Sequence, residues 1–145
     1  MMQYVVLGGR LRRIAIAATA GNVATSLTPG VGYRWSVLAL RVTLVCDATV
    51  ANRNTRVRLM SAAGTTPYQS SRVSANVTAS QTKTLHLEAG PLSNVGSGSY
   101  ESDVLMTHDR DAWSVEGAEQ LKVDISAGVA GDSYSGTLSV LEMPA

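Results

Sequence analysis

The densest group of side chains that could do chemistry lies in the segment Thr107–Trp113, whose sequence is THDRDAW. It brings His108, Asp109 and Asp111 close together, and carboxylates two positions apart on a loop suit a hard cation such as calcium. A calcium loop of the EF-hand type needs further acidic positions and a later glutamate in register, which this segment lacks. We therefore interpret it as a polar loop between two strands and expect neither a metal site nor a cofactor.

Cys46 and His86 are the other residues that could act as catalytic groups. Cys46 ends a long apolar run, where a free cysteine is most simply a small core residue. His86 alternates with apolar neighbours, so we expect it on the outer, solvated face of its strand. No nucleophile elbow or comparable local context accompanies either residue, and a single cysteine allows no intrachain disulfide. The sequence therefore predicts a protein that is not an enzyme.

The elements that position these candidate residues are β-strands, because apolar residues recur mainly at every second position of the sequence. In Glu119–Ala127, Leu121, Val123 and Ile125 alternate with polar residues, which predicts one core face and one wet face. Arg34–Cys46 is largely apolar on both faces, and strict alternation places Leu38 with Leu40 on one face and Trp35 with Val37 on the other. Further strands are expected at Thr55–Met60, Lys83–Leu87 and Ser133–Met143, with shorter ones at Val23–Leu27, Arg72–Thr78, Tyr100–Thr107 and Ala112–Val115.

Turn-forming segments separate these strands, and no stripe of helical period is long enough for a helix. Roughly eight short strands of this kind predict an all-β fold, an antiparallel β-sandwich of jelly-roll type. Residues 1–22 look different, because a Gly8-Gly9 break precedes Arg10, Arg12 and Arg13. We interpret them as an extended N-terminal arm ahead of a single domain over residues 23–145. No apolar stretch approaches the ~20 residues needed to cross a bilayer, so no membrane partner is expected.

Charge is divided unequally between the two halves of the chain. Residues 1–72 carry nine arginines and only Asp47, a net charge of +8, whereas residues 73–145 carry a net charge of −7. Opposite fields of this size favour assembly, either by interleaving the halves in one sheet or by docking on another copy or a different partner. The chain has no RNP-like aromatic motif, zinc knuckle or basic recognition helix, and its total charge is only +1. We therefore expect no specific nucleic-acid partner.

Carbohydrate or receptor binding is an alternative, because sandwich domains often carry it. Five aromatic residues could supply a stacking platform: Trp35, Trp113, Tyr68, Tyr100 and Tyr134. The competing interpretation is that the tryptophans close the ends of the core, as large aromatic side chains usually do.

A longer pattern runs through Leu27–Met60, where a Pro-Gly turn leads into the strand RWSVL, a further strand and the loop ATVANR. This stretch resembles a group of tailed-bacteriophage structural proteins. The matching residues are Pro29, Gly30, Arg34, Trp35, Val37, Leu38, Thr43, Ala48, Thr49, Val50, Asn52 and Arg53. The strand Gln120–Ser126 and the closing segment Leu138–Pro144 are similar to that group as well.

The resemblance implies a non-enzymatic jelly-roll protein of the virion, such as a capsid decoration (cement) protein or another head or neck accessory. A tail or connector ring component is a further alternative, which would differ in its symmetry. The implied partners are other copies of the chain, as a homo-oligomer and most simply a trimer, and the major capsid protein. The implied location is the capsid exterior, after synthesis in the host cytoplasm. Arg10, Arg12 and Arg13 are the candidate partner-binding residues, because an arm could reach the carboxylates of a neighbouring subunit.

Overall fold

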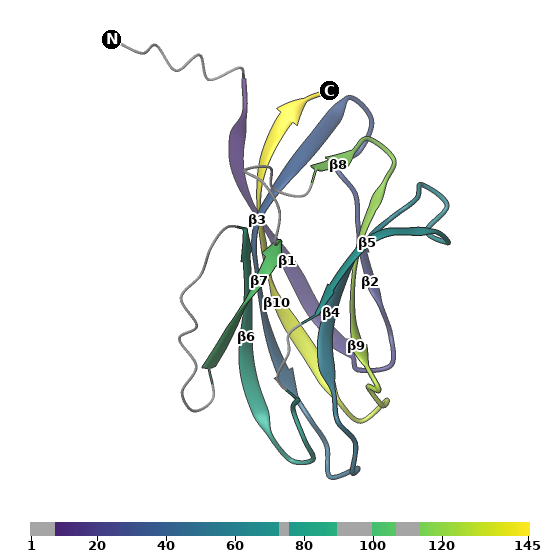
Figure 1. Ribbon diagram of the computed structural model, residues 1–145, viewed down its shortest axis with the longest axis vertical. Coiled ribbons are helices and arrows are strands. Elements are labelled where there is room, and N and C mark those ends of the chain that lie inside the picture. Colours follow the sequence, from purple (N-terminus) through teal and green to yellow (C-terminus); the bar gives the residue numbers. More distant parts are fainter. Residues whose placement is uncertain (1–7, 73–75, 90–99, 107–113) are drawn as a thin grey trace.

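Two β-sheets packed face to face make up the protein, whose computed structural model describes residues 8–72, 76–89, 100–106 and 114–145 (Figure 1). The strands are β1 (Arg10–Ala20), β2 (Thr25–Leu27), β3 (Tyr33–Val45), β4 (Asn54–Met60), β5 (Pro67–Arg72), β6 (Thr82–Ala89), β7 (Tyr100–Met106), β8 (Ser114–Glu116), β9 (Gln120–Ser126) and β10 (Ser133–Pro144). The described residues contain no helix long and apolar enough to cross a membrane. The predicted all-β sandwich is confirmed.

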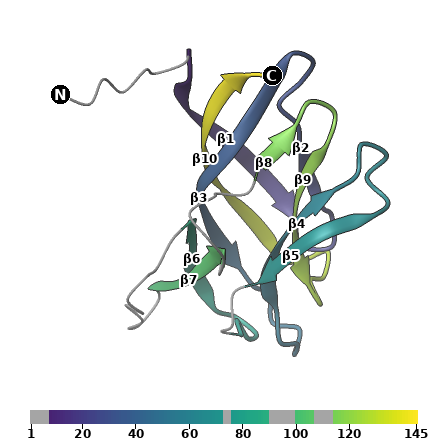
Figure 2. The same ribbon diagram turned by 45° about the horizontal axis from the view of Figure 1, so that its top comes forward.

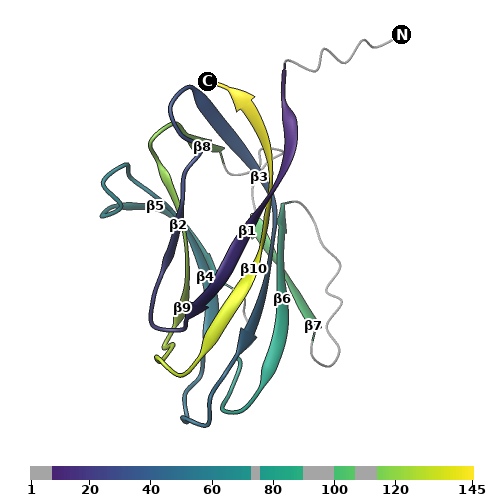
Figure 3. The same cartoon turned by 180° about the vertical axis from the view of Figure 1, so that it is seen from behind.

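The larger sheet, here sheet A, has the strand order β1-β10-β3-β6-β7, with β8 also paired to β3. The smaller sheet, sheet B, has the order β2-β9-β4-β5. Every pair is antiparallel except β6 with β7, which run parallel. Figure 2 shows β4 and β5 side by side on the flank away from β1, and Figure 3 shows β1 running beside β10.

In both sheets a strand from the second half of the chain lies between two strands from the first half. In sheet A, β10 lies between β1 and β3, and in sheet B, β9 lies between β2 and β4. The basic first half and the acidic second half therefore become neighbours within each sheet. This is the first of the arrangements that the charge division favoured.

The core lies between the sheets and follows the alternation of the strands. Leu121, Val123 and Ile125 of β9 are buried, as predicted, opposite the buried Val57 and Leu59 of β4. Sheet A contributes the buried residues Leu40, Val42, Leu44, Leu85, Leu87, Leu138 and Val140. Each such side chain removed from water contributes about 1.5–3 kcal/mol toward folding.

Strand β3 departs from strict alternation at a β-bulge. Ser139 pairs with Ala39 and the next residue of β10, Val140, pairs with Val37, so Leu38 has no partner on β10. The extra residue lets Val37 and Trp35 face the core together with Leu40, while Leu38 is exposed. The sequence-based assignment of Trp35 and Val37 to the face opposite Leu40 was therefore wrong.

The N-terminal segment also differs from the expected arm. Arg10–Ala20 form β1, which pairs with β10 from Arg10 opposite Glu142 to Ala20 opposite Ser133. Residues 1–7 lie outside the described part of the chain. The strand expected at Arg72–Thr78 includes residues 73–75, which lie outside the described part of the chain. On either side of them, β5 ends at Arg72 and Val77 forms an isolated bridge with Arg53.

Candidate interaction site at the β1–β10 edge

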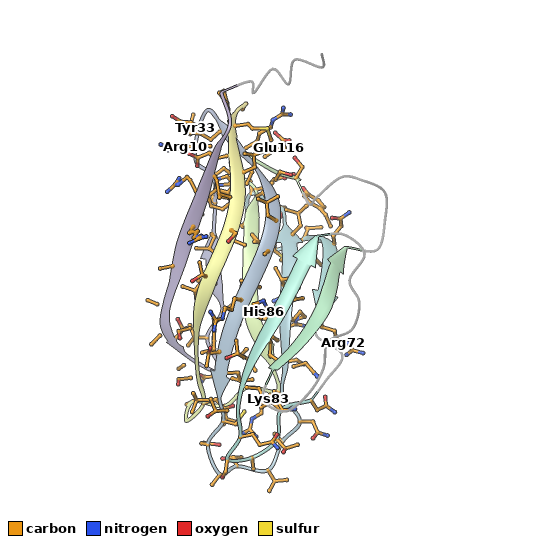
Figure 4. All side chains as sticks on the ribbon, turned by 90° about the vertical axis from the view of Figure 1, so that its left-hand side faces the viewer. Arg10, Tyr33, Arg72, Lys83, His86 and Glu116 are labelled. Carbon is orange, nitrogen blue, oxygen red and sulfur yellow. The ribbon has the colours of Figure 1, made fainter. Side chains whose placement is uncertain are left out.

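The three arginines predicted to bind a partner divide between the two faces of β1. Arg10 and Arg12 share a face with Ile14, which packs against the core, and with the buried Ile16. Arg13 projects to the opposite, outer face of sheet A. Figure 4 shows Arg10 with Tyr33 and Glu116 at one end of the molecule, beyond the core, whereas Lys83 lies toward the other end.

Arg10 and Arg12 meet a buried carboxylate on the neighbouring strand. Glu142 continues the core-facing series of β10 after Leu138 and Val140, and it is only 2% exposed. Arg10 donates from Nε and Nη2 to Glu142 Oε1 at 2.9 and 2.7 Å, and Arg12 donates from Nη1 to Oε2 at 2.6 Å. The indole Nε1 of Trp35 donates to the same Oε2 at 2.9 Å. Four donor atoms thus surround one carboxylate at the end of the sandwich.

This environment strongly favours the ionised form of Glu142. The hydrogen bond from Trp35 lowers the pKa of Glu142, burial opposes it, and the bonds from Arg10 and Arg12 lower it further, to about 2. A buried carboxylate without such donors would instead have a raised pKa. The arrangement therefore fastens the edge strand β1 to β10 and to the start of β3.

The outer side of β1 offers groups that the fold does not use. Arg13 is exposed and makes no ion pair with the described residues, and Leu11 beside it is 62% exposed. Since β1 is the last strand of sheet A, its far edge has no strand partner among the described residues. An unpaired edge with exposed apolar and basic side chains can accept a further strand or a flat partner surface.

A second buried ionic group, which the sequence analysis did not assign, joins the loop that follows β3 to the loop that follows β9. The Arg53 side chain is fully buried; its Nε donates to Asp132 Oδ2 at 2.9 Å and its Nη2 to Asp47 Oδ1 at 3.0 Å. Its Nη1 donates to the carbonyl oxygens of Thr49 and Ala51. The only signals in the sequence were Arg53 in the ATVANR loop and Asp47 as the lone acidic residue before residue 73.

The electrostatics of this group indicate a structural role. Burial would raise the pKa of Asp132, but hydrogen bonds from the amides of Val129 and Asp47 and from Arg53 lower it overall. The hydrogen bond to Asp132 raises the pKa of Arg53. The donors of Arg53 are directed at protein acceptors, so it is positioned to close the loops rather than to bind a ligand.

The residues considered for catalysis lie apart from each other. Cys46 belongs to the core, as predicted, and burial raises the pKa of its thiol. His86 is half-buried on the outer face of sheet A, between the core residues Leu85 and Leu87, and pairs in register with Arg41. The two side chains therefore occupy opposite faces of the sheet.

The aromatic residues considered for sugar stacking do not form one platform. Trp35 is 3% exposed, so the interpretation of this tryptophan as part of the core is correct, and Tyr134 is buried as well, at 1% exposure. The Tyr134 hydroxyl lies 2.9 Å from Thr25 Oγ1 and 2.8 Å from the carbonyl oxygen of Val23, which ties β10 to the start of sheet B. Tyr68 is 56% exposed at a bulge of β5. The side chains of Tyr100 and Trp113 lie outside the described residues.

His108, Asp109 and Asp111 also lie outside the described part of the chain. Within that part, no group of three or more His, Cys, Asp and Glu side chains is arranged to hold a metal ion. Comparison of the chain with protein-family models, with curated proteins and with solved structures finds no match.

Proposed function

We propose that this chain is a non-enzymatic structural protein of a tailed-phage particle, a capsid decoration protein that self-associates and binds the lattice of the major capsid protein. The proposal combines the resemblance of Leu27–Met60 to phage virion proteins with the order of the strands in the sandwich. The strand order is the observation that carries it.

We assign the sandwich to the jelly-roll type. With β7 and β8 set aside as additions between β6 and β9, the two sheets have the orders β1-β10-β3-β6 and β2-β9-β4-β5. The chain then changes sheet at every step except between β4 and β5, and the first strand pairs with the last. This order supports the wrapped hairpin of a jelly roll, an architecture used by viral capsid domains.

In this role, attachment would use the free edge and outer face of β1. Arg10 and Arg12 remain 66% and 42% exposed although they bind Glu142, and Arg13 and Leu11 face outward. A neighbouring subunit can add a strand to this edge or place carboxylates against these arginines. Repetition of the same contact around a closed ring of copies would produce a trimer.

The composition of purified particles tests the proposal directly. Mass spectrometry of virions from a phage that encodes this chain should detect it in a fixed ratio to the major capsid protein. Particles assembled without the chain should bind the purified protein and become more resistant to heat. Absence of the chain from virions would contradict the proposal, and glycan-array binding without particle binding would favour the carbohydrate- or receptor-binding alternative.

The contribution of the β1 edge has its own control. Leu11→Ser with Arg13→Ser should weaken binding to the undecorated particles, and raised salt should weaken binding of the wild type because exposed ion pairs are screened. Val50→Ser is a matched control, because Val50 is 92% exposed in the loop between β3 and β4, at the opposite end of the sandwich from Leu11 and Arg13. Equal binding by all three proteins would remove the β1 edge from the attachment mechanism.

A further inference from the structure

The outer face of sheet B carries an unusual concentration of positive charge. Its side chains alternate with the buried residues of β4 and β9 and therefore point away from the core. The charged members of this face, here called the sheet B patch, are Arg56, Arg58, Arg72, Lys122 and Asp124. Four cations and one carboxylate give the patch a net charge of +3.

The strand register places like charges directly opposite each other. Arg56 of β4 is opposite Arg72 of β5, and Arg58 of β4 is opposite Lys122 of β9. Residues opposite each other on one face have Cβ atoms about 4.5–5.5 Å apart, and like charges in that position destabilise a sheet. The backbone positions of the four cationic residues lie within about 10 Å of each other across the strands and about 7 Å along them.

Asp124 satisfies only part of this charge. Arg56 binds it through Nε at 2.8 Å and Nη2 at 3.0 Å, and Arg58 Nη2 contacts its Oδ2. Lys122 has one long contact, at 3.4 Å, with the carbonyl oxygen of Gly64. Arg72 is exposed, makes no ion pair with the described residues, and lies at the margin of the molecule in Figure 4. Among the residues that the structure describes, the two repulsive pairs therefore share a single counterion, Asp124.

We propose that the sheet B patch is a docking surface for an acidic protein surface, whose carboxylates pair with Arg72 of β5 and Lys122 of β9. The inference rests on charge complementarity and does not depend on the phage assignment. A partner's carboxylates would supply the counterions that the register leaves missing, so charge that destabilises the free chain would stabilise the complex.

The position of Asp124 distinguishes a protein partner from a nucleic acid. Its carboxylate lies within the patch, two residues from Lys122 on β9 and opposite Arg56 on β4, where it repels the continuous line of phosphates that a nucleic-acid backbone would bring. Separate carboxylates of a folded partner can be spaced to reach Arg72 and Lys122 without approaching Asp124. The flat face of the sheet also matches a protein surface better than a pocket for a single small anion.

The test measures fluorescence anisotropy with two probes, a labelled oligoglutamate peptide and a labelled oligothymidylate of equal charge, at low and near-physiological salt. Arg72→Ser with Lys122→Ser should weaken peptide binding by about tenfold, the effect of losing two exposed ion pairs. Arg34→Ser with Arg41→Ser removes the same charge from exposed positions of β3 in sheet A, away from the proposed attachment edge of β1, and should leave peptide binding unchanged.

Thermal melting adds a readout that a purely structural role would not produce. Arg72→Ser should raise or preserve the melting temperature of the free protein, since it removes one repulsive pair. The same substitution should weaken binding of the oligoglutamate peptide. Three results would overturn the proposal: no peptide binding by the wild type at low salt, an equal loss in the sheet A control, or a lower melting temperature in Arg72→Ser. If oligothymidylate bound more tightly than the peptide, and did so through Arg72 and Lys122, the partner would be a nucleic acid and the proposal of an acidic protein would be wrong.

Discussion

Single residues at the end of the sandwich show how this protein buries charge. Glu142 is accessible to almost no solvent, yet it is surrounded by donors from Trp35, Arg10 and Arg12. Removal of the acceptor would leave the buried indole N–H unsatisfied, at a cost of about 1–3 kcal/mol. This one carboxylate therefore connects β10 to β1 and β3, whose donors lie at least 107 positions earlier in the sequence.

Glu142 also predicts a dependence of stability on pH. Because its pKa is lowered from 4.5 to about 2 on folding, its contribution is complete above pH 4.5 and is lost as the pH falls toward 2. The melting temperature of the wild type should drop through that window, and Glu142→Gln should show a smaller drop from a lower starting value. Glu116→Gln, at an exposed position, should follow the wild-type profile, and an identical profile for Glu142→Gln would contradict the assigned role.

At the scale of elements, the bulge in β3 makes an unusual prediction about deletions. The pairs on either side of Leu38 are already consecutive on β10, so deletion of Leu38 would straighten β3 and keep every remaining residue on its present face. We expect this variant to fold with a loss of about 1–3 kcal/mol, measured by chemical denaturation.

Deletion of Arg41 provides the contrast. It would exchange the inward and outward faces on one side of the cut, because no bulge absorbs the missing residue. The Arg41 deletion should therefore yield no cooperative unfolding transition. Failure of both variants to fold would show that the faces on β3 are not set by the bulge.

The elements also show why some of the structure was predictable. The alternation of Leu121, Val123 and Ile125 is local and identifies the core face of β9 without knowledge of its neighbours. The change of face at Leu38 depends on the pairing of β3 with β10, and the sequence around Leu38 contains no local signal for it. The strand β1 was missed because Arg10 and Arg12 looked unsuited to a sheet, and the glutamate that accommodates Arg10 is 132 positions away. The donors around Glu142 were hidden for the same reason.

On the scale of the whole molecule, ion pairs within the chain neutralise part of the charge division. Five of the six ion pairs between described residues join an arginine of the first half to a carboxylate of the second, and only the pair of Arg53 with Asp47 lies within one half. The halves depend on each other for strand pairing as well, since β10 and β9 separate strands of the first half.

This interdependence can be tested with fragments. A fragment of residues 8–72 should show no cooperative melting by circular dichroism, because its strands lack their central neighbours and bury too little apolar surface. Mixing with residues 73–145 should restore a β-sheet spectrum, and more readily at low salt because opposite charges steer the association. A fragment of residues 8–72 that melts cooperatively alone would contradict this view.

The contact between Trp35 and Glu142 has an optical consequence. A buried indole whose N–H is bound to an ionised carboxylate reports on that carboxylate, because protonation or separation of the pair changes the environment of the chromophore. The chain has only one other tryptophan, Trp113, so a Trp113→Phe variant would leave Trp35 as a single fluorescent reporter. Its emission would follow the opening of the β1 end of the sandwich in real time, without any added label.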